Sequence, residues 1–243
     1  MRRFTALFFA AAFSLSAFAQ GPDSVSPSTR SYHKYRFEMT KPSFGLAKVS
    51  RLVATLKPDS EDNRRLSAER WNSLTPEEKF TYCMIHGEDM MQNCDVMPWL
   101  EGEQHKVFAY LPGAFDSEEA GWSERQRSYM KAHRGEFIRL LRSTFQARHR
   151  VGANLKGAVV QLNAVELIPD LIKVYNYDRK DQDILTVLML LMKEGKYQPF
   201  LSSATYKKLY GNGANYQAFV EANPGNQKLM FDRAMGFYRS RRG

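Results

Sequence analysis

The sequence contains little cysteine and none of the familiar catalytic motifs. Its 243 residues include two cysteines, Cys83 and Cys94, and their spacing matches no familiar zinc-binding pattern. There is no Gly-x-Ser-x-Gly, no His-Glu-x-x-His and no phosphate-binding loop. The reaction classes that depend on these motifs are therefore not predicted, and we expect neither a metal nor a cofactor.

Long apolar runs and strand-like patterns are also scarce. After the N-terminal segment, no stretch reaches the roughly 20 apolar residues that cross a membrane. The longest, from Ile184 to Met192, has nine residues including Thr186 and is typical of a buried helix. Alternation of apolar and polar residues, which marks a half-buried strand, is nearly absent. The sequence therefore predicts an all-α protein, either an antiparallel helical bundle or a short helical stack, with no transmembrane segment after signal cleavage.

An export signal is the clearest feature that is present. Two arginines at positions 2 and 3 precede an apolar run over residues 4–18, and Ala17-Phe18-Ala19 supplies the small-x-small pattern that a signal peptidase reads. The run is shorter than a bilayer span, which argues against a membrane anchor. We expect cleavage after Ala19, a mature chain that begins at Gln20, and a periplasmic or secreted protein.

The charge balance is basic. The chain has 35 Lys and Arg against 26 Asp and Glu, and loss of the two signal arginines leaves a net charge of +7. An exported basic protein meets anionic lipid headgroups, glycans and wall polymers before it meets nucleic acid. We therefore expect no nucleic-acid partner. The alternative is a solvated surface of mixed sign that has no such partner.

Composition divides the chain into a cleaved signal peptide (1–19), a flexible leader (20–43) and a single α-helical domain (44–243). The leader is rich in Ser, Pro and Thr and lacks helical periodicity. In the domain, apolar residues recur at helical spacing in several segments. The predicted helices cover residues 46–56, 62–71, 76–86, 123–148, 153–175 with a break at Pro169, 181–194, 204–210, 216–222 and 226–239.

Local signals are strong in one place and weak in another. In Thr75-Pro76-Glu77-Glu78, the threonine can cap a helix, proline suits the first turn, and Glu78 can complete a capping box. Residues 88–122 are instead interrupted repeatedly by Pro and Gly and predict an irregular loop segment. Within it, Lys106 to Leu111 is either a short strand or one helical turn.

The segment 166–193 resembles a HEAT-type helical hairpin. Its first helix contains Leu167-Ile168-Pro169-Asp170-Leu171, an Asp178-containing turn follows, and the apolar run 184–192 forms the second helix. That family pairs two antiparallel helices across a short turn, often with Pro in the first helix and Asp in the turn. The resemblance implies a stacked helical architecture and a binding surface, and it implies no reaction.

The two cysteines lie within a polar cluster. In an oxidising compartment an isolated pair suggests one disulfide, here between Cys83 and Cys94. A straight helix would hold them about 16 Å apart, so we expect a chain reversal near Gly87. The alternatives are two buried thiols, or a zinc site that also uses His86 and His105.

An enzymatic alternative uses the same region. His86 and Glu88 are the candidate catalytic residues of an envelope hydrolase that acts on wall glycan or peptide through residues 86–103. The acidic pairs at 101 and 103 and at 118 and 119 could in principle cleave a glycosidic bond. The simpler account places His86 in the last turn of a helix, where it is favourable toward the helix dipole.

Aromatic and basic residues gather around the end of the irregular segment. Trp99 and Trp122 could stack on a ligand, or they could pack the loops onto the helices. Arg125 and Arg127 follow on a predicted helix and suit an anionic partner, unless they form a solvated face. The leading hypothesis is an exported, non-enzymatic helical binding protein of the cell envelope, whose partner is an envelope protein or an anionic polymer.

Overall fold

The computed structural model describes residues 22–92, 99–215 and 217–241. The predicted signal peptide and Cys94 lie outside these ranges. The described residues form twelve α-helices and four short strands, which confirms the predicted all-α class. The helices are α1 (Pro27–Phe37), α2 (Leu46–Ala54), α3 (Ala68–Asn72), α4 (Pro76–Ile85), α5 (Glu124–Ala132), α6 (Arg134–Arg148), α7 (Ala153–Gln161), α8 (Ile168–Asp178), α9 (Asp183–Glu194), α10 (Gln198–Leu201), α11 (Ala204–Tyr210) and α12 (Pro224–Ser240).

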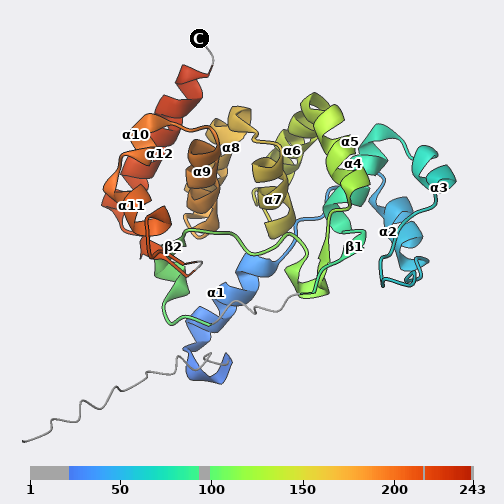
Figure 1. The fold of residues 1–243 in the computed structure, drawn as a ribbon, viewed down its shortest axis with the longest axis horizontal. Coiled ribbons are helices and arrows are strands. Elements are labelled where there is room, and N and C mark those ends of the chain that lie inside the picture. The colour runs from blue at the N-terminus through green and yellow to red at the C-terminus, as the bar shows by residue number, and fades with distance from the viewer. Residues whose placement is uncertain (1–21, 93–98, 216, 242–243) are drawn as a thin grey trace, which may run out of the picture.

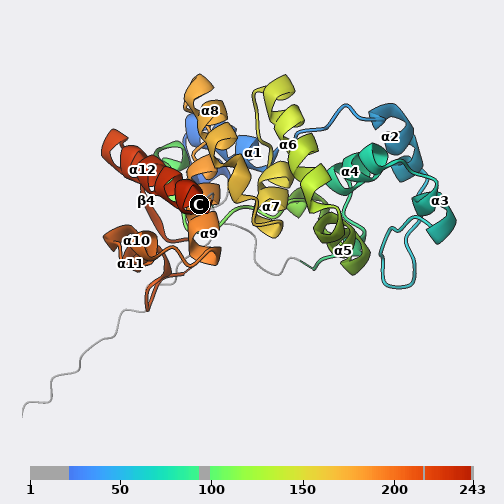
Figure 2. The same ribbon diagram turned by 90° about the horizontal axis from the view of Figure 1, so that it is seen from above.

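The helices form a row that runs from α10–α12 at one end to α2 and α3 at the other (Figures 1 and 2). The core lies around α9, in which ten of twelve residues are buried. This helix contacts α7, α8, α10 and α12. Leu171 of α8 and Leu188 of α9 are both fully buried. Among the described residues, no helix combines the length and the apolar character needed to cross a membrane.

Helix ends follow the local sequence closely. Thr75 and Glu78 form the predicted capping box at the start of α4. Pro169 lies in the first turn of α8, so the predicted break in 153–175 separates α7 from α8. The long helix predicted from residue 123 is also divided, because His133 departs from helical geometry between α5 and α6.

Two predicted helices are wrong in part. Residues 216–222 contain the strand β4 (Phe219–Glu221), which pairs antiparallel with β2 (Lys106–Phe108). This pairing also resolves the ambiguity of residues 106–111 in favour of a strand. Helix 62–71 is reduced to α3, because the carboxylate of Asp59 accepts hydrogen bonds from the amides of Glu61 and Asn63 and turns the chain. Two further strands, β1 (Asp89–Met90) and β3 (Ala120–Gly121), pair antiparallel beside α4.

The flexible leader predicted for residues 20–43 is wrong over most of its described part. Helix α1 lies beneath the row in Figure 1 and buries Thr29, Tyr32, His33 and Arg36. These four positions have the i, i+3, i+4, i+7 spacing of a helical stripe, but the stripe is polar. Its periodicity is invisible to a search for apolar residues, because its partners are hydrogen-bonding groups elsewhere in the chain.

A buried ionic network holds α1 against the core. The Arg36 guanidinium donates to both carboxylate oxygens of Asp183, with Nε–Oδ2 and Nη2–Oδ1 distances of 3.0 Å, and to Glu103 at 3.2 Å. Lys156 of α7 donates to Asp181 at 2.7 Å. Burial alone would raise the pKa of Asp183, but the charges of Arg36 and Lys156 outweigh it and hold that pKa below its usual value.

Candidate functional site

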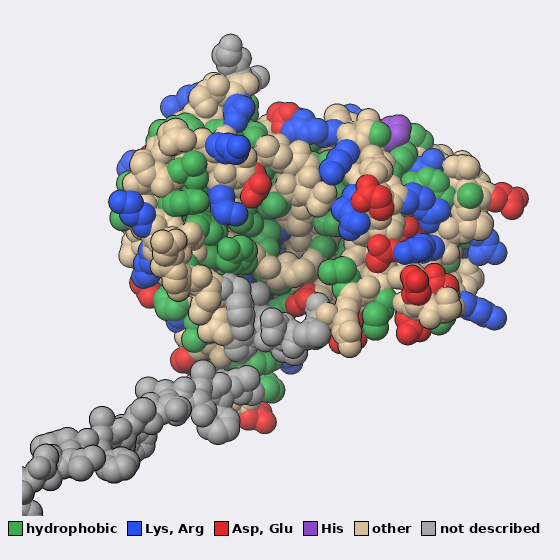
Figure 3. Space-filling view, in the orientation of Figure 1, with side chains coloured by type: hydrophobic (Ala, Val, Ile, Leu, Met, Phe, Trp, Pro, Cys, Tyr) green, Lys and Arg blue, Asp and Glu red, His purple; other side chains and the backbone are tan. Residues whose placement is uncertain are grey.

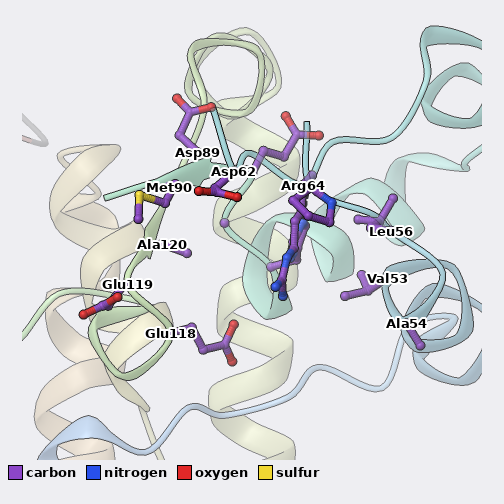
Figure 4. A pocket seen from close by; sticks show the side chains of 14 residues that line it. Val53, Ala54, Leu56, Asp62, Arg64, Asp89, Met90, Glu118, Glu119 and Ala120 are labelled. Atoms are coloured by element: carbon purple, nitrogen blue, oxygen red, sulfur yellow. Dashed lines mark hydrogen bonds between the residues drawn. The ribbon is translucent and has the colours of Figure 1, made fainter. Parts of the chain in front are cut away.

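A cleft of about 630 Å³ opens between α2, the loop that follows it, and the β1–β3 pair. We call it the His86 cleft, and Figure 4 shows it from close by. Apolar side chains of α2 and its following loop form one wall, and charged residues form much of the rest. Its lining residues are Val53, Ala54, Leu56, Pro58, Asp62, Arg64, His86, Gly87, Glu88, Asp89, Met90, Glu118, Glu119 and Ala120.

His86 is fixed by the backbone around it. It is the C-terminal cap of α4, and its Nε2 lies 2.5 Å from the carbonyl oxygen of Arg64. A carbonyl can only accept, so Nε2 carries the hydrogen. Burial lowers the pKa of His86, which favours the neutral ring. The residue therefore closes the helix as a neutral donor, and the predicted favourable charge at the helix dipole is not what holds it there.

Glu88 is fully buried and its carboxylate is surrounded by donors. It accepts from Tyr82 Oη at 2.9 Å, from Ser123 Oγ at 2.5 Å and from the Arg125 guanidinium. Its backbone amide donates to the side chain of Gln126. A buried carboxylate costs free energy unless it is paired and hydrogen-bonded, and here both conditions are met. Glu88 thus joins α4, β1 and α5, and its oxygens are committed to the fold.

The rim of the cleft holds carboxylates of a different kind. Within the described ranges, the side chains of Asp62, Glu118 and Glu119 make no hydrogen bond or ion pair. Asp62 and Glu118 lie on opposite sides of the hollow in Figure 4. Asp89 differs, because Arg65 binds it at 2.6 Å. Arg64 is the exposed cation of the lining, so the carboxylates without partners outnumber it.

The residues predicted for binding have contacts inside the molecule. The indole N–H of Trp122 donates to the Cys83 carbonyl at 2.6 Å. Arg125 binds Glu88, as well as the Leu66 carbonyl at 3.0 Å, and Arg127 binds the Trp122 carbonyl. These three side chains fasten α5 and the loop before it to α4. They do not form the free basic face that the sequence suggested.

Trp99 has different neighbours and lines a second cleft. Its ring stacks on His33 with centroids 3.9 Å apart and an interplanar angle of 21°. This cleft has a volume of about 550 Å³, and we call it the His33 cleft. It is lined by His33, Lys34, Phe37, Glu38, Met39, Trp99, Asp116 and Ser117. Sequence reasoning missed His33 because it lies in the segment interpreted as a flexible leader.

Of the two cysteines, only Cys83 lies within the described residues. Cys83 is fully buried, and burial raises the pKa of its thiol, which favours the protonated form if the residue is not bonded to Cys94. Cys94 lies outside the described residues, and the disulfide stays a prediction. His105, the other suggested zinc ligand, lines a separate cleft with Gln104 and Lys180. In the described part of the chain, no three His, Cys, Asp or Glu side chains are grouped so as to hold a metal ion.

Of the two acidic pairs, Glu118 and Glu119 both line the His86 cleft, but Glu101 and Glu103 do not share a space. Glu101 accepts from the amide and the hydroxyl of Ser26, both at 2.7 Å, whereas Glu103 is buried in the network of α1.

Comparison with known proteins adds no further assignment: no protein-family model, no curated protein and no solved structure matches this chain.

Proposed function

We propose that the mature protein is an exported, non-enzymatic binding protein of the cell envelope, and that the His86 cleft is its ligand site. The proposal rests on a difference between two sets of polar groups in the cleft: one set bonds within the fold, and the other has no partner among the described residues. His86 and Glu88, which acid–base catalysis would need, are committed to hydrogen bonds within the fold. The groups left for a ligand are Asp62, Glu118 and Glu119 at the rim, with an apolar wall beside them.

The charge of this rim selects the ligand class. Three carboxylates without partners face one exposed arginine, so the cleft favours a cation although the whole chain is basic. In Figure 3, acidic side chains lie among basic ones over the half of that face where Figure 1 places α2, α3 and β1. An envelope protein that presents a Lys or Arg side chain on an extended segment fits this arrangement. Its ammonium or guanidinium group would lie between Asp62 and Glu118, and its apolar neighbours would pack on Val53 and Leu56.

Fluorescence anisotropy with a labelled Ala-Lys-Ala-Lys-Ala peptide tests the proposal. We expect saturable binding that weakens as salt rises from about 20 to about 150 mM, because the Debye length shrinks to about 8 Å. The double variant Asp62→Asn, Glu118→Gln should weaken binding at least tenfold. The matched control Glu194→Gln, Asp232→Asn makes the same change in net charge at exposed sites on α9 and α12. An equal loss in both double variants would contradict a specific site.

The hydrolase alternative is tested on the same material. Purified protein is incubated with wall glycan and wall peptide, and the products are separated by mass spectrometry. Turnover that is lost in His86→Ala or in Glu88→Gln, with the fold retained, would replace the binding proposal with the hydrolase.

A further inference from the structure

A chain of buried polar contacts leads from the core to the His33 cleft. Asp183 holds the Arg36 guanidinium with two-pronged geometry, and Arg36 donates to Oε2 of Glu103 at 3.2 Å. The other oxygen of Glu103 lies 2.8 Å from Nδ1 of His33. The backbone amide of Leu100 also donates to this carboxylate, at 3.1 Å. Each group is therefore held by the one behind it, and His33 is the last member of the chain.

This arrangement fixes which ring nitrogen of His33 is available. The Glu103 carboxylate, paired with Arg36, accepts, so Nδ1 carries the hydrogen and Nε2 of the neutral ring keeps its lone pair. Among the described residues, none makes a hydrogen bond with Nε2. The His33 side chain is 9% exposed and lines the cleft. Nε2 is therefore an acceptor that a hydrogen-bond donor entering the cleft can reach without displacing a partner among the described residues.

The walls of the cleft define what such a ligand needs. Trp99, Phe37 and Met39 supply flat and apolar surface, and Lys34 and Ser117 supply polar groups at the edge. The volume of about 550 Å³ lies in the range of small-molecule sites. A sugar ring combines the two required surfaces, because its C–H face packs on an aromatic ring while its hydroxyls donate hydrogen bonds.

We propose that the His33 cleft is a saccharide-binding site, in which Trp99 packs against a sugar ring and His33 Nε2 accepts a hydrogen bond from one of its hydroxyls. Glu103 and Arg36 are positioning residues, since they hold the imidazole without touching the ligand. The site is separate from the His86 cleft, with which it shares no lining residue. Its existence does not depend on the function proposed for that cleft.

The experiment uses the full mature chain and three named probes: chitotriose, cellotriose and maltotriose. Histidine ring signals are followed by two-dimensional NMR while each trisaccharide is added to about 10 mM, which detects millimolar affinity. We expect saturable shifts of the His33 ring signals with at least one trisaccharide. His33→Phe, which keeps a ring beside Trp99 but removes both nitrogens, should weaken binding at least tenfold, and Trp99→Leu should do the same.

His149→Phe is the matched control, because His149 also stacks on an aromatic ring, that of Tyr177 at 4.9 Å, but is exposed. It should leave the affinity unchanged. If His33→Phe fails to fold, the titration of the unaltered protein still decides. No saturable His33 shift with any of the three trisaccharides overturns the proposal, as does full affinity in a folded His33→Phe variant.

Discussion

Replacement of Arg36 by Met tests whether α1 belongs to the folded core. Methionine keeps an apolar stem of similar length but removes the guanidinium, so Asp183 loses three hydrogen bonds and Glu103 loses one. The Arg36 side chain and both carboxylates are 1% exposed, and solvent cannot compensate for the loss. Removal of one member of a buried ion pair costs about 3–5 kcal/mol, and we expect this destabilisation of the native state.

Thermal unfolding followed by circular dichroism measures the effect. A chain of this size loses about 2–4 °C of Tm for each kcal/mol, so the variant should melt about 6–20 °C lower. The control is Arg30→Met in the same helix. Arg30 pairs with an Asp23 side chain that is 99% exposed, and the change should cost less than about 1 kcal/mol. If Arg36→Met melts within about 2 °C of the unaltered protein, the network does not anchor α1 and our account of residues 27–37 fails.

Four further outcomes follow from other parts of the molecule. Leu188→Ala should cost about 2–5 kcal/mol in denaturant unfolding, because its side chain is fully buried in α9; a loss below 1 kcal/mol would contradict this packing. Burial lowers the pKa of His86, so its contribution to stability is present above the unfolded-state pKa of about 6.5 and is lost as the pH falls toward the folded-state value; His86→Gln should flatten this part of the stability profile. Intact mass of exported protein should show a chain that begins at Gln20, and a retained Met1 would refute cleavage. Thiol labelling of unfolded, unreduced protein should find no free cysteine if Cys83 and Cys94 are bonded, and two labels per chain if they are not.

Apolar periodicity and capping signals were enough to predict most of the helical core. In the C-terminal helix, Met230, Ala234 and Phe237 face inward as their spacing indicates. The capping box at Thr75 forms because all of its partners lie within four residues. Such features depend on local geometry alone, and a single sequence contains all the information that they need.

The features that the sequence analysis missed depend on partners that are distant in sequence. Helix α1 is stabilised by a polar stripe that binds Glu103 and Asp183. The burial of this stripe cannot be predicted without knowing that these two residues lie beside it. Strand β4 forms because β2 offers it an edge, from residues more than 100 positions earlier. From the sequence alone Glu88 is a candidate catalytic residue, but in the structure Tyr82, Ser123 and Arg125 bind its carboxylate. In each case tertiary contacts decide between a structural and a functional role.

The contacts that dock α1 also join residues that are synthesised far apart in time. Arg36 and Asp183 are 147 positions apart, and Tyr32 and Gln182 are 150 positions apart. At roughly 5–20 residues per second, the second partner follows the first by roughly 7–30 s. During that interval Arg36 and Tyr32 lack Asp183 and Gln182, although Glu103 follows Arg36 by only 67 positions, and closure of so long a loop is slow. Helix α1, although it is the first α-helix of the described residues, is therefore among the last to complete its contacts.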